Sequence, residues 1–167
     1  MFDLFRYESF FSVWYWVLTV TVWVLVCQRT LGVPHDMVLR AGRRPEVAAR
    51  VDALARIGAE RIAGVGETLG TPLAAAAGFG LAALAVLGFH TGVEAAKASF
   101  LLLFPLGIVA VGAVRLARHV RGAGLTGAPL RRALGRRRSA NQVIAILAII
   151  AAAIAALGHP PRGFGLY

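Results

Sequence analysis

The sequence predicts an all-α integral membrane bundle of four transmembrane helices, with an amphipathic cytoplasmic helix between spans one and two. Apolar residues make up 58% of the 167 residues, and the mean hydropathy of +0.70 is far above that of water-soluble domains. Four apolar runs approach the length that crosses a bilayer, and most arginines lie between them in two long segments. We therefore expect residues 1–167 to form a single membrane domain.

The expected spans cover residues of about 10–28, 71–89, 98–116 and 140–157. Each is mostly apolar over roughly the 20 residues that the hydrocarbon core of a bilayer requires. Trp14, Tyr15 and Trp16 lie near the start of the first span, where amphipathic rings favour the level of the lipid headgroups. The second span begins with Pro72, which suits a first helical turn because that position needs no N–H donor.

The distribution of positive charge predicts the orientation of the spans. Of the 18 lysines and arginines, seven lie between spans one and two and eight between spans three and four. Loops rich in lysine and arginine stay on the cytoplasmic side of a membrane. Both arginine-rich segments are therefore expected in the cytoplasm, and both termini on the opposite, periplasmic side.

A helix is expected over residues 45–65, in the first arginine-rich segment. Apolar residues recur there at steps of three or four and predict one apolar stripe, formed by Val47, Val51, Leu54, Gly58, Ile62, Val65 and Leu69. Such a helix lies on the inner leaflet, or it docks on a partner or on the other cytoplasmic segment. We favour the first alternative.

The stretch "LGVPHDMVLRAGRR" follows the first span and predicts the corner where the chain leaves the membrane. Gly32 and Pro34 break the helix, and Asp36 is expected to cap the next helical turn by accepting backbone N–H groups. The second arginine-rich segment, residues 117–139, contains glycines and a proline and is expected to be a basic loop. Candidate contacts to anionic lipid or to a partner are Asp36, Arg40, Arg43, Arg44, Arg131, Arg132, Arg136, Arg137 and Arg138.

The residues that usually carry chemistry are sparse. Cys27 is the single cysteine, so neither a disulfide nor a cysteine-ligated zinc or iron–sulfur site can be built from this chain alone. We find no nucleotide-binding or catalytic motif and expect no enzyme, no cofactor and no nucleic-acid partner, because topology already accounts for the arginines. Axial ligation of haem by opposed histidines near the span ends is a minor alternative; these are His35, His90, His119 and His159.

Small residues at helical spacing predict close helix packing. Ala74 and Gly78 form one such row, and Ala148, Ala152 and Ala156 form another. Rows of this kind let transmembrane helices approach closely. They suit a compact bundle, contact with another membrane protein, or a homo-oligomer.

Two stretches carry a resemblance to a known family. "WYW" followed by "LGVPHDMVLRAGRR", and later "LGFHTGVEAAKASFLLLFP", are similar to small multi-pass membrane proteins of proteobacteria labelled "component of SufBCD complex". The resemblance covers about Phe11 to His119 and implies a protein of the bacterial inner membrane that assists cytosolic Suf proteins in iron–sulfur cluster assembly. It supplies no catalytic residues.

We therefore expect a non-enzymatic membrane accessory or scaffold protein. The alternative is a small oligomeric transporter or channel. The scarcity of ionisable residues within the spans argues against the alternative, because such residues mark most transport paths.

Overall fold

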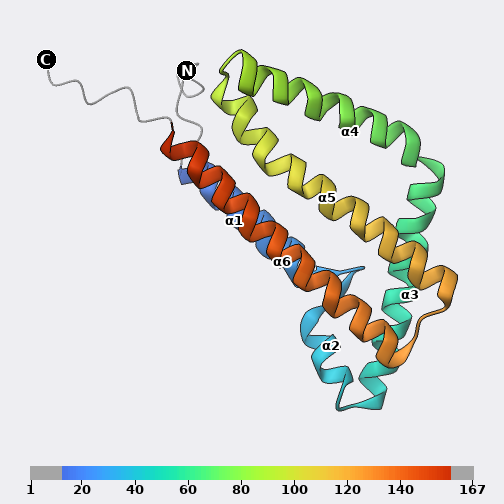
Figure 1. Ribbon diagram of the computed structural model, residues 1–167. Coiled ribbons are helices and arrows are strands. Elements are labelled where there is room, and N and C mark those ends of the chain that lie inside the picture. The colour runs from blue at the N-terminus through green and yellow to red at the C-terminus, as the bar shows by residue number, and fades with distance from the viewer. Residues whose placement is uncertain (1–12, 159–167) are drawn as a thin grey trace, which may run out of the picture.

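The computed structural model describes residues 13–158, which form helices apart from one short β-hairpin and the connecting turns (Figure 1). In chain order the elements are α1 (Val13–Gln28), β1 (Arg29–Thr30), β2 (Val33–Pro34), α2 (His35–Ala41), α3 (Pro45–Thr68), α4 (Gly70–Ala85), the π-helix η2 (Val86–His90), α5 (Glu94–Ala123) and α6 (Gly127–Leu157).

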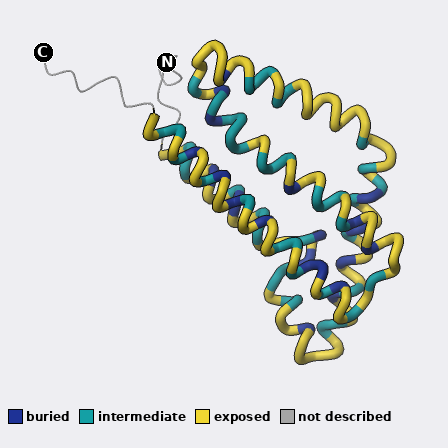
Figure 2. The backbone as a smooth tube through the Cα atoms, in the orientation of Figure 1, coloured by how far each residue is buried: buried dark blue, intermediate teal, exposed yellow. Residues whose placement is uncertain are grey.

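Three helical segments are long and apolar enough to cross a membrane: Gly70–His90, Glu94–Ala123 and Gly127–Leu157. Helix α1 is equally apolar but shorter, with 16 described residues, and positions 10–12 of the expected first span lie outside the described residues. Helix α4 has no buried residue, and its outer surface is exposed along its length (Figure 2). Apolar helices of this length with exposed outer surfaces are stable in lipid, so an all-α membrane bundle is confirmed.

The apolar helices pack as neighbours. α4 packs against α5, α5 against α6, and α6 against α1. Figure 1 shows the start of α1, the end of α6 and the connection between α4 and α5 at one end of the molecule. The arginine-rich segments lie at the other end. Ala148 and Ala152, from one of the expected small-residue rows, are buried on α6, whereas Ala74 and Gly78 lie on the exposed surface of α4.

The prediction of a basic loop over residues 117–139 is wrong. α5 continues to Ala123, α6 begins at Gly127, and only three residues connect them. Gly124 ends α5 in the left-handed conformation (φ 57°), which glycine adopts without steric cost. The helices persist because Ala117, Val120, Leu130 and Leu134 share one buried core.

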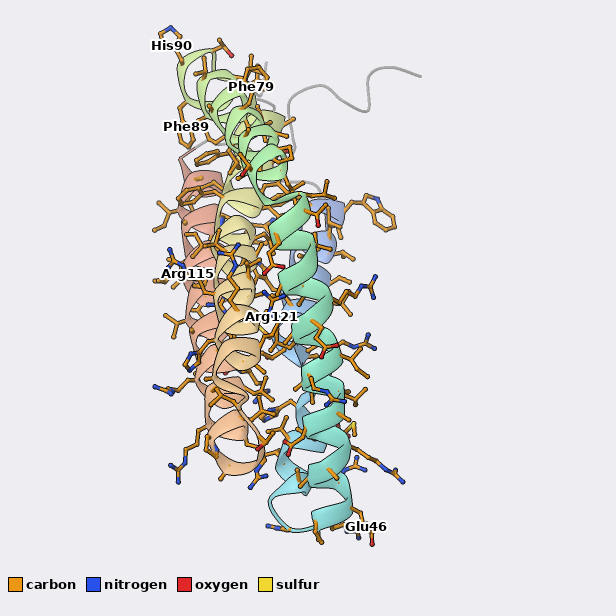
Figure 3. All side chains as sticks on the ribbon, turned by 90° about the vertical axis from the view of Figure 1, so that its right-hand side faces the viewer. Glu46, Phe79, Phe89, His90, Arg115 and Arg121 are labelled. Carbon is orange, nitrogen blue, oxygen red and sulfur yellow. The ribbon has the colours of Figure 1, made fainter. Side chains whose placement is uncertain are left out.

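The expected amphipathic helix is present as α3, and it packs on α5 and α6. It runs beside α5 and α6 and continues beyond them, so that Glu46 and His90 lie at opposite ends of the molecule (Figure 3). Its buried residues are Val51, Ala55, Ala59 and Ala63. The alternative of docking on the other arginine-rich segment is therefore the one observed. The side of α3 that carries the alanines is buried, because their small side chains allow α3 to pack closer to α5 than large aliphatic side chains would.

The membrane-exit corner is a β-hairpin that rests on α3. Arg29 pairs with Pro34 and Thr30 with Val33, and the two turn residues, Leu31 and Gly32, both have positive φ. Two-residue turns of this kind match the natural twist of paired strands. The carbonyl oxygen of Leu31 lies so close to Gly58 that a Cβ atom there would come within 2.1 Å of it. Gly58 is thus the position at which the hairpin packs on α3.

Candidate functional site

The candidate site is the arginine-rich end, which we define as residues 29–69 and 115–138. These residues contain fifteen arginines and five carboxylates, a surplus of ten positive charges. Twelve of the arginines are exposed, and the other three, Arg131, Arg137 and Arg138, are half-buried. The charge therefore covers the surface of this end.

Beneath that surface lies a hydrophobic core of its own. Leu31, Val33, Val51, Leu130 and Leu134 are among its members, and each is at most 5% exposed. A second, smaller core surrounds Trp23 and Val109 among the apolar helices. Because the two cores share no residue, the arginine-rich end forms a packed unit of its own on the same helices.

Two hydrogen-bonding contacts link α3 to the rest of this unit. Both oxygens of the Asp52 carboxylate accept the backbone N–H of Gly127, at 3.1 and 3.0 Å, and so satisfy an amide at the start of α6. Arg121 donates to Glu67 through both of its terminal nitrogens. The hydrogen bond from Arg121 lowers the pKa of Glu67 below its usual value, so the carboxylate stays charged at neutral pH.

Asp36 and Arg40 face each other on α2. A terminal nitrogen of Arg40 lies 2.6 Å from Asp36 Oδ2, one helical turn away. The expected capping role of Asp36 is wrong: Pro34 is the N-cap of α2, and no side chain caps this helix. Asp36 lies within the first turn of α2, where its negative charge stabilises the helix. Its carboxylate accepts a hydrogen bond from Arg40 instead of from backbone N–H groups.

Arg137 and Arg138 point inward and bind backbone carbonyls of neighbouring helices. Arg137 donates to the carbonyl of Val109 on α5 at 2.6 Å, and Arg138 donates to the carbonyl of Cys27 on α1 at 3.3 Å. The guanidinium of Arg137 crosses α5 at Gly112, where a Cβ atom would lie 2.2 Å from its central carbon. These two candidates therefore join helices where the apolar bundle meets the arginine-rich end.

The other candidates remain on the surface. Arg43 and Arg44 lie between α2 and α3, and Arg132 and Arg136 are exposed on α6, while Arg131 is half-buried there. His35 begins α2 near Arg138, and its pKa is lowered by burial and by that guanidinium. It is therefore neutral at neutral pH and adds nothing to the positive charge.

A half-open pocket of about 460 Å³ lies between α3 and the turn that joins α5 to α6. Val120 and Leu125 are apolar members of its lining, and its charged members are Asp52, Arg56, Glu60 and Arg121. Asp52 and Arg121 are engaged by the contacts described above. Arg56 and Glu60 approach each other only to 4.0 Å and stay exposed.

A polar row among the apolar helices was not predicted from the sequence. Tyr15, Thr19 and Trp23 recur every four residues on α1, and Thr19 and Trp23 are buried. Asn141 is buried on α6, one turn beyond Arg137. The four-residue spacing of polar side chains in an apolar helix was the available signal, since such positions face other helices rather than lipid. This row marks the face of α1 that packs inward.

Among residues 13–158, no group of three or more histidine, cysteine, aspartate or glutamate side chains gathers as a metal site would require. His159, one of the histidines considered for haem, lies outside the described residues. In the comparisons with known proteins, no family model, no curated protein and no solved structure matches this chain.

Proposed function

We propose that the chain is a non-enzymatic accessory or scaffold protein of the bacterial inner membrane. Four spans hold it in the bilayer, and the arginine-rich end binds anionic partners in the cytoplasm. One observation carries this proposal: the end is a packed unit with its own core, yet it carries a surplus of ten positive charges, and twelve of its fifteen arginines are exposed. Such a surface attracts acidic molecules at a distance and holds them by charge.

The sidedness rests on the positive charges. Fifteen of the 18 lysines and arginines belong to the arginine-rich end, which the positive-inside rule assigns to the cytoplasm. The start of α1 and the end of α6 lie at the opposite end of the bundle (Figure 1). Both termini are then periplasmic.

We predict that an alkaline phosphatase reporter fused after Tyr167 is active, because this enzyme folds only in the periplasm. The same reporter inserted at Gly124, in the turn between α5 and α6, is the matched control and should be inactive. Equal activity at both positions, or the reverse pattern, would overturn the four-span topology.

Two kinds of anionic partner suit different arginines. Arg29 and Arg115 are exposed near the ends of α1 and of the apolar part of α5, where phosphate headgroups of anionic lipids lie. The exposed arginines of α2, α3 and the start of α6 stand farther from the apolar helices. They suit acidic soluble proteins, and the resemblance described above makes the Suf assembly proteins the first partners to test.

A photo-crosslinking amino acid at Leu39 should capture soluble proteins in intact cells, because this side chain is 65% exposed at the arginine-rich end. The control position is Leu157, which is 83% exposed at the C-terminal end of α6, opposite the arginine-rich end. We expect soluble proteins, the Suf components among them, only from position 39, as identified by mass spectrometry. Capture of lipid alone at both positions would contradict the scaffold proposal. Solute flux through proteoliposomes would favour a transporter instead.

A further inference from the structure

The outer face of α3, which we define as Arg50, Leu54, Ile57, Arg61 and Val65, is directed away from the core. These positions follow one another at intervals of three or four residues and therefore share one side of the helix. The buried residues Val51, Ala55, Ala59 and Ala63 occupy a different side. Leu54, Ile57 and Val65 are 39%, 59% and 48% exposed, and both arginines are exposed as well.

In the topology proposed above, lipid does not cover the middle of this face. α3 runs beside the part of α5 that carries Arg118 and Arg121 and continues slightly beyond the end of α5 (Figure 3). Ile57 precedes the first residue of α4, Gly70, by 13 positions, which corresponds to about 20 Å of helix axis. Leu54 lies one turn farther out. In the topology proposed above, both side chains stand in water beyond the headgroups.

Large aliphatic side chains grouped in this way mark a contact surface. Single exposed leucines are common on soluble proteins, but an aligned apolar row with charged flanks is typical of a helix that packs on a partner. Burying Leu54 and Ile57 in a complex would remove their apolar surface from water. The exposed row is therefore a binding surface that the monomer leaves open.

The arginines distinguish between a second copy and a different protein. Copies in one membrane share one orientation, so a two-fold dimer axis stands along the membrane normal and each α3 would meet its counterpart in parallel. Arg50 would then face Arg50, and Arg61 would face Arg61. Like charges brought together at an interface are unfavourable, whereas carboxylates at the same positions would attract.

We infer that the outer face of α3 binds an acidic amphipathic helix of a soluble protein. Leucine-like side chains of that helix pack on Leu54 and Ile57, and its carboxylates pair with Arg50 and Arg61. This is recognition of one helix face by another, with apolar side chains for affinity and charge for selectivity. The inference rests on the proposed function, because it needs this end of the chain in the cytoplasm.

The test uses the full chain in nanodiscs of zwitterionic lipid. The probe is a fluorescent helical peptide with leucines along one face and glutamates beside them, and its binding is followed by anisotropy. We expect the double variant Leu54→Ser and Ile57→Ser to weaken binding at least tenfold. The control variant Leu39→Ser, at a leucine of α2 that is 65% exposed and lies outside the outer face of α3, should bind like the unchanged protein. A second peptide has the same charge but serines in place of the leucines. It should bind the unchanged protein weakly, with an affinity similar to that of the double variant for the probe.

Equal binding of the probe by the unchanged protein and the double variant would overturn the inference. So would an inter-copy disulfide at Ile57→Cys in a Cys27→Ser background, because it would show that a second copy covers the face. These failures differ from failure of the scaffold proposal. If only the α3 surface is misassigned, crosslinking at Leu39 still captures soluble proteins; if the scaffold proposal fails, it captures none.

Discussion

Replacing Gly58 with alanine is expected to destabilise the arginine-rich end by about 3 kcal/mol, at the upper end of typical overpacking costs. The added Cβ atom would lie 2.1 Å from the carbonyl oxygen of Leu31 and 3.0 Å from its carbonyl carbon. Both are backbone atoms of a hairpin turn, so relief requires the hairpin to move away from α3. Leu31 and Val33, now 5% and 1% exposed, would lose their burial at the same time.

Hydrogen–deuterium exchange on the full chain in detergent measures this effect, with faster exchange expected at Val33 and in the middle of α3. Gly64→Ala is the matched control on the same helix, because a Cβ atom there meets nothing within 4 Å. Alanine favours a helix over glycine by about 1 kcal/mol, so the control should slow exchange in α3. If the two variants exchange alike, the hairpin does not sit on Gly58 as described.

Replacing Leu130 with alanine is expected to cost about 2–5 kcal/mol, the range for deleting a buried leucine side chain. Leu130 is fully buried near the start of α6, in the core that also holds Val51 and Val120. The cavity would weaken the contact of α6 with both α3 and α5. Chemical denaturation in detergent, followed by tryptic cleavage at the arginines of α3 and α6, gives the change in stability.

The control is Leu147→Ala, also on α6 but 61% exposed. Removing that side chain leaves no internal cavity, so a change within about 0.5 kcal/mol is expected. If Leu130→Ala changed the stability as little as Leu147→Ala does, the start of α6 would not be packed in the core of the arginine-rich end as described.

The apolar helices were predictable because membrane crossing imposes a simple requirement on length and polarity. The second span, expected at residues 71–89, corresponds to α4 and η2 at Gly70–His90 almost residue for residue. The helix expected over residues 45–65 is present as Pro45–Thr68. Which residues that helix buries was not predictable from hydrophobicity, because the row that meets α5 and α6 is mainly alanine.

The candidate site was predicted in composition but not in arrangement. The arginines of residues 131–138 were identified as one basic cluster, yet Arg137 and Arg138 turn inward to Val109 and Cys27. Their neighbours Arg132 and Arg136 stay on the surface. In a run of consecutive arginines, the helical turn alone decides which ones face another helix, and the run itself carries no periodic signal.

The sequence by itself determined the class of the molecule, its apolar helices and the gathering of positive charge in two segments, because these follow from local composition. The tertiary structure alone decided that the two segments fold together over one core and that α3 packs on α5 through its alanine row. It also decided that Leu54 and Ile57 stay exposed while Ala55 and Ala59 are buried. That outcome depends on the close approach of helices distant in sequence, a property that no single segment encodes.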